Sequence, residues 1–98
     1  MVTTKEIVGA LTQCLDPELN ANIVDIGLVY GIRIGQDNSV KITITMTSPM
    51  CPVTSIIMAD VQLRVEALKE VARVELDLVW DPLWNPEMMS DELKYGRM

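Results

Sequence analysis

Apolar residues recur every three to four positions near the N-terminus, at Ile7, Leu11 and Cys14 or Leu15. This spacing is typical of an amphipathic helix. Thr3 and Glu6 stand just before the repeat at the spacing of a capping box, and Pro17 disfavours helical angles in the residue that precedes it. We therefore predict a helix over residues 4–15, followed by a loop over residues 16–27.

Two stretches in the middle of the chain alternate between apolar and other side chains, which is the period of a strand with one buried face. They cover residues 28–34 and 40–47, and residues 35–38 between them are turn formers. In the second stretch the apolar positions are Val40, Ile42, Ile44 and Met46, and the opposite positions are Lys41, Thr43, Thr45 and Thr47. The pattern predicts a hairpin with one apolar and one polar face.

A second helical repeat follows the hairpin, at Val53, Ile57, Val61, Val65 and Leu68. It predicts a helix over residues 52–70 whose first position is Pro52, where the missing N–H would have had no partner. Residues 74–80 alternate again and predict a third strand. Residues 81–98 form a proline-containing tail in which Ser90-Asp91-Glu92 is able to begin a short helix.

The order of elements is thus α-β-β-α-β. It predicts an α+β two-layer sandwich, in which two helices cover one face of a three-stranded sheet. A chain of 98 residues is the size of one domain, so we expect residues 1–98 to share a single core. The 49% apolar residues are sufficient to fill that core.

Charge and composition exclude several classes of protein. A net charge of −6, with eight scattered Lys and Arg residues, disfavours a nucleic-acid partner. No long apolar run and no basic leader are present, which predicts a cytoplasmic protein without a membrane partner. The absence of histidine excludes Ser-His-Asp and Cys-His catalysis and every zinc site that contains histidine.

The two cysteines fall in segments that look structurally unrelated, so a disulfide framework is not expected and a reducing compartment fits. Cys14 lies on or beside the first apolar stripe and is expected in the core. Cys51 directly precedes the expected helix start at Pro52, where free N–H groups and the helix dipole favour a thiolate. Such a sulfur can act as a nucleophile, bind a metal or hold one corner of an iron–sulfur cluster. Alternatively, Cys51 only caps the helix.

Five residues are candidates for a supporting role beside Cys51, namely Asp16, Glu18, Asp25, Thr47 and Ser48. Carboxylates beside a thiolate can serve as mixed iron or zinc ligands or as proton carriers, and hydroxyls can donate hydrogen bonds to a sulfur ligand or a substrate oxygen. Alternatively, these residues have only structural roles. The carboxylates would form a solvated turn at a helix end, and the threonines would lie on an exposed strand face.

Trp80, at the end of the third predicted strand, and Trp84, Met88 and Met89 of the tail are large apolar side chains in a segment without alternation. Such a segment either packs over its own domain or binds a partner protein. Covering the region near Cys51 is the simpler alternative, but the residues alone leave the choice open. We therefore keep the four side chains as a candidate partner-binding surface.

Four blocks, taken together, resemble the metal–sulfur cluster assembly factors of the SufT and PaaD-like group. They are Asp16-Pro17-Glu18-Leu19, Asn22 to Tyr30, Met46 to Pro52, and Trp80 to Ser90. The resemblance implies an iron–sulfur assembly domain that assists the maturation of iron–sulfur proteins. It also implies that Cys51 is the reactive position and that Asp16, Glu18 and Asp25 lie beside it. Scaffold or carrier proteins and client apoproteins are the partners that it implies.

PaaD proteins carry an additional cysteine-rich C-terminal region, whereas this sequence has no cysteine after Cys51, which favours the general assembly-factor branch. We predict an accessory factor rather than an enzyme, with iron or a cluster held transiently at Cys51 and no tightly bound cofactor. One thiol needs oxygen ligands, a small thiol or a second subunit to hold a cluster, and a symmetric homodimer that joins two Cys51 thiols is the simplest geometry. An adaptor without metal and a cysteine-nucleophile enzyme are the alternatives.

Overall fold

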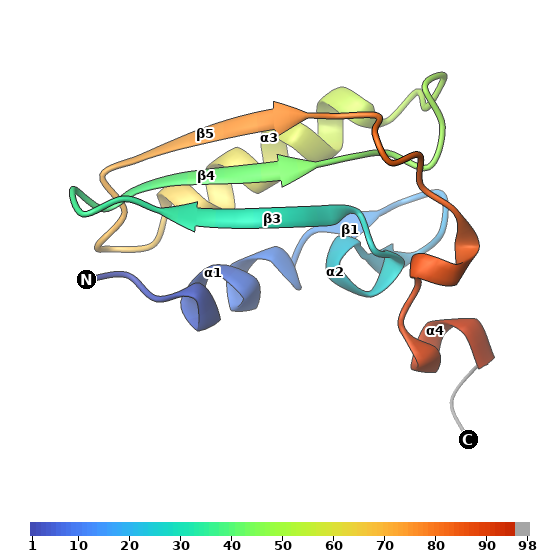
Figure 1. Cartoon of the computed structure of the whole chain (residues 1–98), viewed down its shortest axis with the longest axis horizontal. Helices are drawn as coiled ribbons and strands as arrows, with labels where there is room; N and C mark the ends of the chain where they lie inside the picture. Colours follow the sequence, from blue (N-terminus) through green and yellow to red (C-terminus); the bar gives the residue numbers. More distant parts are fainter. Residues whose placement is uncertain (96–98) are drawn as a thin grey trace.

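The computed structural model describes residues 1–95 and contains ten helical and strand elements within them (Figure 1). They are α1 (Thr4–Leu11), β1 (Leu15–Asp16), β2 (Ala21–Asn22), α2 (Ile23–Ile26), β3 (Val29–Ile34), β4 (Ser39–Ile44), α3 (Thr54–Glu66), β5 (Arg73–Leu78), the 3-10 helix η1 (Pro86–Met88) and α4 (Asp91–Tyr95). The predicted α-β-β-α-β order is confirmed by α1, β3, β4, α3 and β5.

The main sheet has the order β3-β4-β5. β3 and β4 form the predicted antiparallel hairpin, while β5 returns through α3 to pair with β4 in parallel. At the centre of the sheet, Ile42 stands between Ile32 of β3 and Leu76 of β5. The sequence prediction of an α+β domain with a three-stranded sheet is therefore correct.

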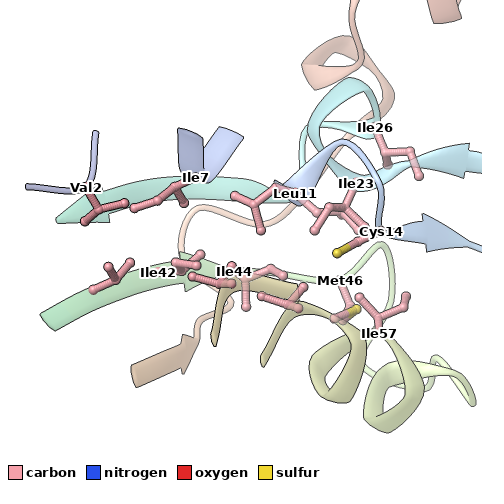
Figure 2. Close-up of a cluster of buried hydrophobic side chains, with 14 residues drawn as sticks. Val2, Ile7, Leu11, Cys14, Ile23, Ile26, Ile42, Ile44, Met46 and Ile57 are labelled. Carbon is pink, nitrogen blue, oxygen red and sulfur yellow. The ribbon is translucent and has the colours of Figure 1, made fainter. Parts of the chain in front are cut away.

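One hydrophobic core joins the helices to the sheet. Ile7 and Leu11 of α1, Ile42 and Ile44 of β4, and Ile57 of α3 are buried in a single cluster (Figure 2). Because the buried residues of β4 are its alternate positions, the core occupies one face of the sheet. Both long helices cover that face, and Lys41 and Thr43 remain on the other.

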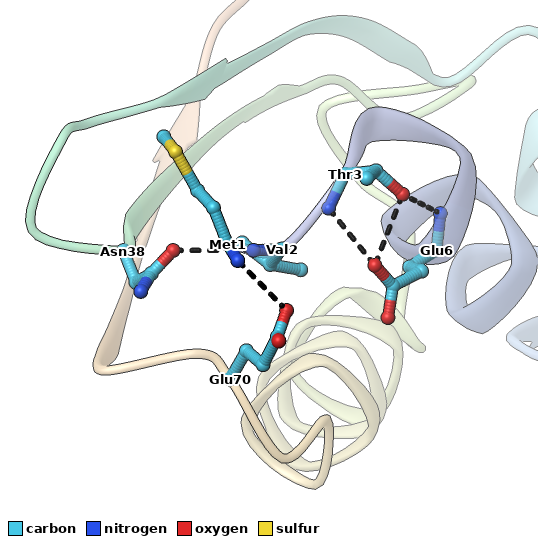
Figure 3. A network of polar contacts seen from close by, with 6 residues as sticks. All are labelled: Met1, Val2, Thr3, Glu6, Asn38 and Glu70. Carbon is cyan, nitrogen blue, oxygen red and sulfur yellow. Dashed lines mark hydrogen bonds and ion pairs between the residues drawn. The ribbon is translucent and has the colours of Figure 1, made fainter.

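Polar contacts fasten the start of the chain (Figure 3). The capping box at α1 is confirmed, since Glu6 N donates to Thr3 Oγ1 over 3.2 Å and Thr3 N donates to Glu6 Oε1 over 3.1 Å. The backbone N–H of Val2 donates to Asn38 Oδ1 over 3.2 Å, and the terminal amine lies 3.4 Å from Glu70 Oε2. α1 is thereby held beside the β3–β4 turn.

The segment predicted as a loop over residues 16–27 contains a small hairpin, β1–β2, and the short helix α2. Asn22 caps α2 by accepting a hydrogen bond from Asp25 N over 2.9 Å, and Gly27 ends it with φ of 90°, in the left-handed region. The predicted first helix is also too long, because α1 ends at Leu11. These elements are short and depend on capping rather than on an apolar repeat, so periodicity does not reveal them.

The tail lies against α2 and the start of β3 (Figure 1). Tyr30 Oη donates to the carbonyl of Pro82 over 2.9 Å, and Trp84 Nε1 donates to the carbonyl of Ile26 over 2.8 Å. A short helix, α4, begins at Asp91 as predicted, and residues 96–98 of the predicted tail lie outside the described residues. Within residues 1–95, no helix is long and apolar enough to span a membrane.

Candidate functional site around Cys51

Cys51 lies in the turn that joins β4 to α3. Its N–H donates to the carbonyl of Ser48 over 3.1 Å, and the Ser48 hydroxyl accepts from Met50 N over 3.2 Å. On the other side, the carbonyl of Cys51 accepts from Thr54 Oγ1 over 2.9 Å. Backbone and hydroxyl contacts thus fix the turn, and the Cys51 side chain remains partly exposed.

The predicted helix start is wrong. α3 begins at Thr54, and Val53 occupies the cap position without a side-chain cap hydrogen bond. Pro52 lies instead in a separate turn, which the Thr54 N–H closes by donating to the carbonyl of Cys51 over 3.4 Å. Cys51 therefore stands three residues before α3, so the predicted direct stabilisation by the free N–H groups of the first helical turn does not apply to it.

Glu18 is the carboxylate that the fold places against this sulfur. Its Oε1 lies 3.7 Å from Cys51 Sγ, within the distance of a thiol–carboxylate hydrogen bond. Glu18 is exposed and comes from the turn between β1 and β2, 33 residues before Cys51. The predicted approach of the first loop to the cysteine is thus present for this residue, and a thiol and a carboxylate share one surface position.

Asp16 shapes the turn that carries Glu18. Its side chain is 1% exposed, and its Oδ1 accepts hydrogen bonds from Glu18 N over 2.8 Å and from Leu19 N over 3.4 Å. Its carbonyl accepts from Asn20 N over 2.7 Å. Asp16 therefore uses its oxygens on the backbone of residues 18–20 and positions Glu18 rather than lying free beside the thiol.

Asp25 makes its contacts at a different place. Its Oδ2 accepts from Asn22 Nδ2 over 3.0 Å, and its carbonyl accepts from Ser90 N over 2.7 Å. It also lines a cavity of about 400 Å³ with Leu15, Asn20, Ala21, Asn22, Glu92 and Leu93. The observed contacts connect Asp25 to the cap of α2 and to the tail.

The predicted set of mixed sulfur and oxygen ligands is incomplete in the fold. Among residues 1–95, no three Cys, Asp or Glu side chains are grouped closely enough to hold a metal ion. The contact between Cys51 and Glu18 brings together one sulfur, Sγ, and one carboxylate. A metal ion at this position would need its remaining ligands from another molecule.

The hydroxyl residues before Cys51 have unequal environments. Ser48 is exposed and Thr47 is half-buried, whereas Thr45 is fully buried and its Oγ1 has no hydrogen-bond partner among the described residues. Thr45 follows the last residue of β4, and its N–H donates to the carbonyl of Leu28 over 2.9 Å. The predicted exposed polar face therefore does not extend as far as Thr45.

The two cysteines differ in accessibility. Cys14 is 0% exposed, as expected for a core residue, and its Sγ approaches the carbonyl of Ala10 at 3.8 Å. Burial and the neighbouring carboxylate of Asp60 raise the pKa of Cys14 from 9.0 to about 11. Neither cysteine forms a disulfide. Cys51 is the thiol that a partner or reagent can reach.

The predicted partner surface of the tail is largely occupied within the chain. Trp80, Trp84, Met88 and Met89 are all half-buried, and both tryptophans pack against the core cluster. Met88 Sδ lies 3.3 Å from Tyr30 Oη. Of the two alternatives for this segment, packing over the domain is present, and a role of these side chains in partner binding stays a prediction.

The apolar side chains next to the thiol–carboxylate pair were not identified from the sequence. Met50, adjacent to Cys51, is 85% exposed, and Leu19, adjacent to Glu18, is 43% exposed. Ser48, Pro49 and Pro52 around Met50 are turn formers, and turns run over the protein surface, which is the sequence signal for an exposed Met50. The pair thus lies in a partly apolar surface.

Comparison with known proteins places the chain in a family. Residues 4–76 match the family described as iron-sulfur cluster assembly protein. A Porphyromonas gingivalis protein named Fe-S protein maturation auxiliary factor is 42% identical over 90 residues, covering 92% of this chain and 86% of that protein. The Bacillus subtilis Fe-S protein maturation auxiliary factor YitW is 42% identical over 86 residues, covering 88% and 84%.

A solved structure agrees with the fold. The crystal structure of a domain of unknown function from Bacillus anthracis superposes with a TM-score of 0.90 at 36% identity, covering 94% of this chain and 88% of that one. The sequence matches and the structural superposition therefore each cover most of the chain. The chain belongs to the iron–sulfur cluster assembly protein family.

Proposed function

We propose that this protein is an accessory factor in the maturation of iron–sulfur proteins, with Cys51 as the thiol that contacts iron or a cluster. The observation that carries the proposal is the exposed pair formed by Cys51 Sγ and Glu18 Oε1, 3.7 Å apart. Membership of the assembly family and the names of the relatives support the same role. Iron, or a cluster, is the cargo of the protein.

The separation of the two atoms suits one metal ion. A tetrahedral ion with sulfur at about 2.3 Å and oxygen at about 2.1 Å has these two ligands roughly 3.6 Å apart. The observed 3.7 Å is close to this value, which supports the proposal that Sγ and Oε1 form one edge of a coordination shell. The Glu18 charge attracts a cation to the sulfur, and the exposed carboxylate can accept the thiol proton and release it to water as the metal–sulfur bond forms.

The small number of ligands supports the proposal that the protein holds its iron or cluster only transiently. An iron–sulfur cluster is usually held by four protein ligands, so the donor or the client must supply the others. Because Cys51 and Glu18 contribute only one edge, the bound state is easily exchanged. We propose that cargo passes by ligand exchange, without a covalent intermediate or a catalysed reaction, in a reducing compartment such as the cytoplasm that keeps Cys51 as a thiol.

Partner recognition follows from the surroundings of the pair. Met50 and Leu19 are exposed apolar side chains next to the two reacting groups, and such side chains are typical of the centre of a protein interface. We propose that scaffold or carrier proteins and client apoproteins bind across this surface. The half-buried tail residues Trp84 and Met88 contact Ile26 and Tyr30, so in this proposal they hold the tail on the domain and do not contact the partner first.

The test compares Cys51→Ser with Cys14→Ser as the control for loss of a thiol. Both variants, and the wild type, are expressed in cells that lack the native protein, and the activity of an iron–sulfur reporter enzyme is measured. Purified proteins are also loaded anaerobically with iron and sulfide. We expect Cys51→Ser to lose reporter activity and metal binding while Cys14→Ser keeps both. Equal metal binding by wild type and Cys51→Ser removes Cys51 from the ligands.

The exposed apolar residues favour a second candidate, an adaptor that joins partners without holding metal. Met50→Lys changes this surface and leaves the thiol and Glu18 in place. If Met50→Lys abolishes reporter activity while Cys51→Ala supports it, the adaptor is the correct function. The reverse result supports the thiol.

A further inference from the structure

α3 has an apolar face that points away from the core. Ile56 is 61% exposed and Leu63 is 68% exposed, and Ala59 and Ala67 are exposed as well. The four residues follow one another at intervals of three and four, so they form one stripe along the helix. We call these four residues the outer stripe.

The outer stripe is separate from the residues that α3 buries in the domain. Ile57, Val61 and Val65 are at most 1% exposed and form the core face. At 100° per residue, the direction of Leu63 is nearly opposite to that of Val61 and Val65. A helix in a two-layer domain needs one apolar face, and α3 has two. The second face is therefore available to another protein.

Charges along the two flanks of the outer stripe indicate which protein fits. One flank carries Asp60 and Arg64, whose Oδ1 and Nε lie 2.8 Å apart and whose side chains are 33% and 45% exposed. The other flank carries Ser55, Gln62 and Glu66, with Gln62 Nε2 donating to Glu66 Oε2 over 2.7 Å. The first flank thus has one acid and one base, a single helical turn apart.

Such a flank is complementary to itself in an antiparallel arrangement. When a two-fold axis relates two antiparallel helices, each flank of one helix faces the same flank of the other. Two residues then lie at the same height along the helix pair when their residue numbers add up to a constant, which is twice the position of the axis. With the axis between residues 61 and 62, the constant is 123. Asp60 and Arg64 of the second copy then lie within one residue of the same height, and so do Leu63 and Ala59 of the second copy. Glu66 lies within two residues of the height of Ser55 of the other helix, so no like charges meet.

We propose that the outer stripe of α3 is a docking surface for a second copy of this chain, with the two α3 helices packed antiparallel. One helix face is smaller than the roughly 800 Å² per partner of a standard interface, so the dimer is weak and depends on concentration. The two Cys51 residues then lie at opposite ends of the helix pair, on the order of 30 Å apart. This differs from a dimer that joins the two thiols, and each copy keeps its own accessible site.

The first test uses Leu63→Lys and a control with matched exposure. Leu83 is 68% exposed, like Leu63, but belongs to the tail, so Leu83→Lys adds the same charge elsewhere. Sedimentation equilibrium of the whole protein is measured up to millimolar concentration in reductant. We expect Leu63→Lys to weaken dimerisation more than about tenfold, since it removes two buried leucines per dimer, while Leu83→Lys matches the wild type.

The second test reverses single charges. Asp60→Arg and Arg64→Asp each place like charges opposite each other in the homodimer, so each variant alone is expected to be monomeric where the wild type is dimeric. In an equimolar mixture, two arginines face two aspartates, and we expect the heterodimer to form. Circular dichroism of each variant checks that the fold is retained.

Several results would overturn the proposal. A wild type that stays monomeric at every concentration excludes it, and so does a mixture of the two charge variants that does not associate. Loss of the dimer in Cys51→Ser assigns association to the thiols instead of to α3. Loss of reporter activity in Leu63→Lys, with a monomeric wild type, assigns the stripe to a foreign protein. The oligomer measurement does not depend on metal binding at Cys51, so the failure of one proposal is distinguishable from the failure of the other.

Discussion

The sulfur of Cys51 lies 3.7 Å from Oε1 of Glu18, although 33 residues separate them in the chain. A carboxylate at this distance repels an anionic reagent that approaches the sulfur, because like charges repel. We predict that Glu18→Gln raises the rate at which the anionic reagent iodoacetate alkylates Cys51 by roughly two- to fivefold, the effect of one exposed charge.

The rate is measured by mass spectrometry at low ionic strength, and Glu75→Gln on β5 is the control for removal of one exposed negative charge. Added salt should reduce the difference between Glu18→Gln and the wild type, because ions screen exposed charges. An unchanged rate in Glu18→Gln at low salt would show that the carboxylate does not act on the sulfur in solution.

A second prediction concerns Cys14, whose pKa is raised from 9.0 to about 11 by burial and by Asp60. Because the folded protein holds the neutral thiol, its stabilising effect is complete below pH 9.0 and is lost as the pH rises toward 11. The free energy of unfolding should fall by about 2–3 kcal/mol across this interval as a result of Cys14.

Urea unfolding at a series of pH values measures this effect, with Cys14→Ala as the comparison. Below pH 9.0 the variant is less stable because it leaves a small cavity, and its free energy of unfolding should fall less steeply than that of the wild type above pH 9.0. Parallel curves for the two proteins would assign the alkaline loss of stability to other groups.

A third prediction concerns Gly27, which has φ of 90° and lies directly against the carbonyl of Met88. A Cβ at this position would overlap the Met88 backbone, so Gly27→Ala combines backbone strain with displacement of the tail. We expect a loss of at least about 1–2 kcal/mol in urea unfolding. Gly9 in α1 is the matched control, because a Cβ there meets nothing within 4 Å. Gly9→Ala should stabilise by about 0.5–1 kcal/mol.

A fourth prediction concerns Trp84, whose indole N–H donates to the carbonyl of Ile26 over 2.8 Å. Trp84→Phe keeps an aromatic ring but leaves the carbonyl of the buried Ile26 without its donor, which should destabilise by about 1–2 kcal/mol. Trp80→Phe changes the same residue type in the same segment and is the comparison. If the two variants unfold at the same urea concentration, the indole hydrogen bond contributes nothing measurable to stability.

The parts of the fold that the sequence predicts are those with a long repeat. The alternation at Val40, Ile42 and Ile44 located β4 because one face of that strand is buried and the other is open. The spacing of Ile57, Val61 and Val65 located α3 for the equivalent reason. Both patterns are direct results of burial on one side.

The parts that the sequence did not predict are set by single contacts. α2 exists because Asn22 caps it and Gly27 ends it, and four residues are too few for a periodic signal. α3 starts at Thr54 and not at Pro52, because Pro52 and Val53 form a turn closed by the hydrogen bond from Thr54 N to the carbonyl of Cys51. Capping and turn contacts of this kind have weak sequence signatures.

The candidate site, like the fold, is predicted by the sequence only in part. The resemblance to a family indicated three carboxylates near Cys51, and the fold brings Glu18 to the sulfur while Asp16 bonds the backbone of its own turn. Residues two apart in a tight turn need not point the same way, so spacing cannot decide which one faces the thiol. The direction of each side chain is decided by the hydrogen bonds that close the turn.

The contacts between the tail and residues 25–27 have a consequence for how the molecule opens. Trp84 bonds Ile26, Ser90 bonds Asp25, and the Met88 backbone lies on Gly27, so three points of the tail are fixed to one turn of helix. Detaching the tail exposes the carbonyl oxygens of α2, and unwinding α2 releases the tail. The two segments therefore form one cooperative unit, and the Ser90 amide and the Trp84 indole proton should exchange with deuterium at a common rate.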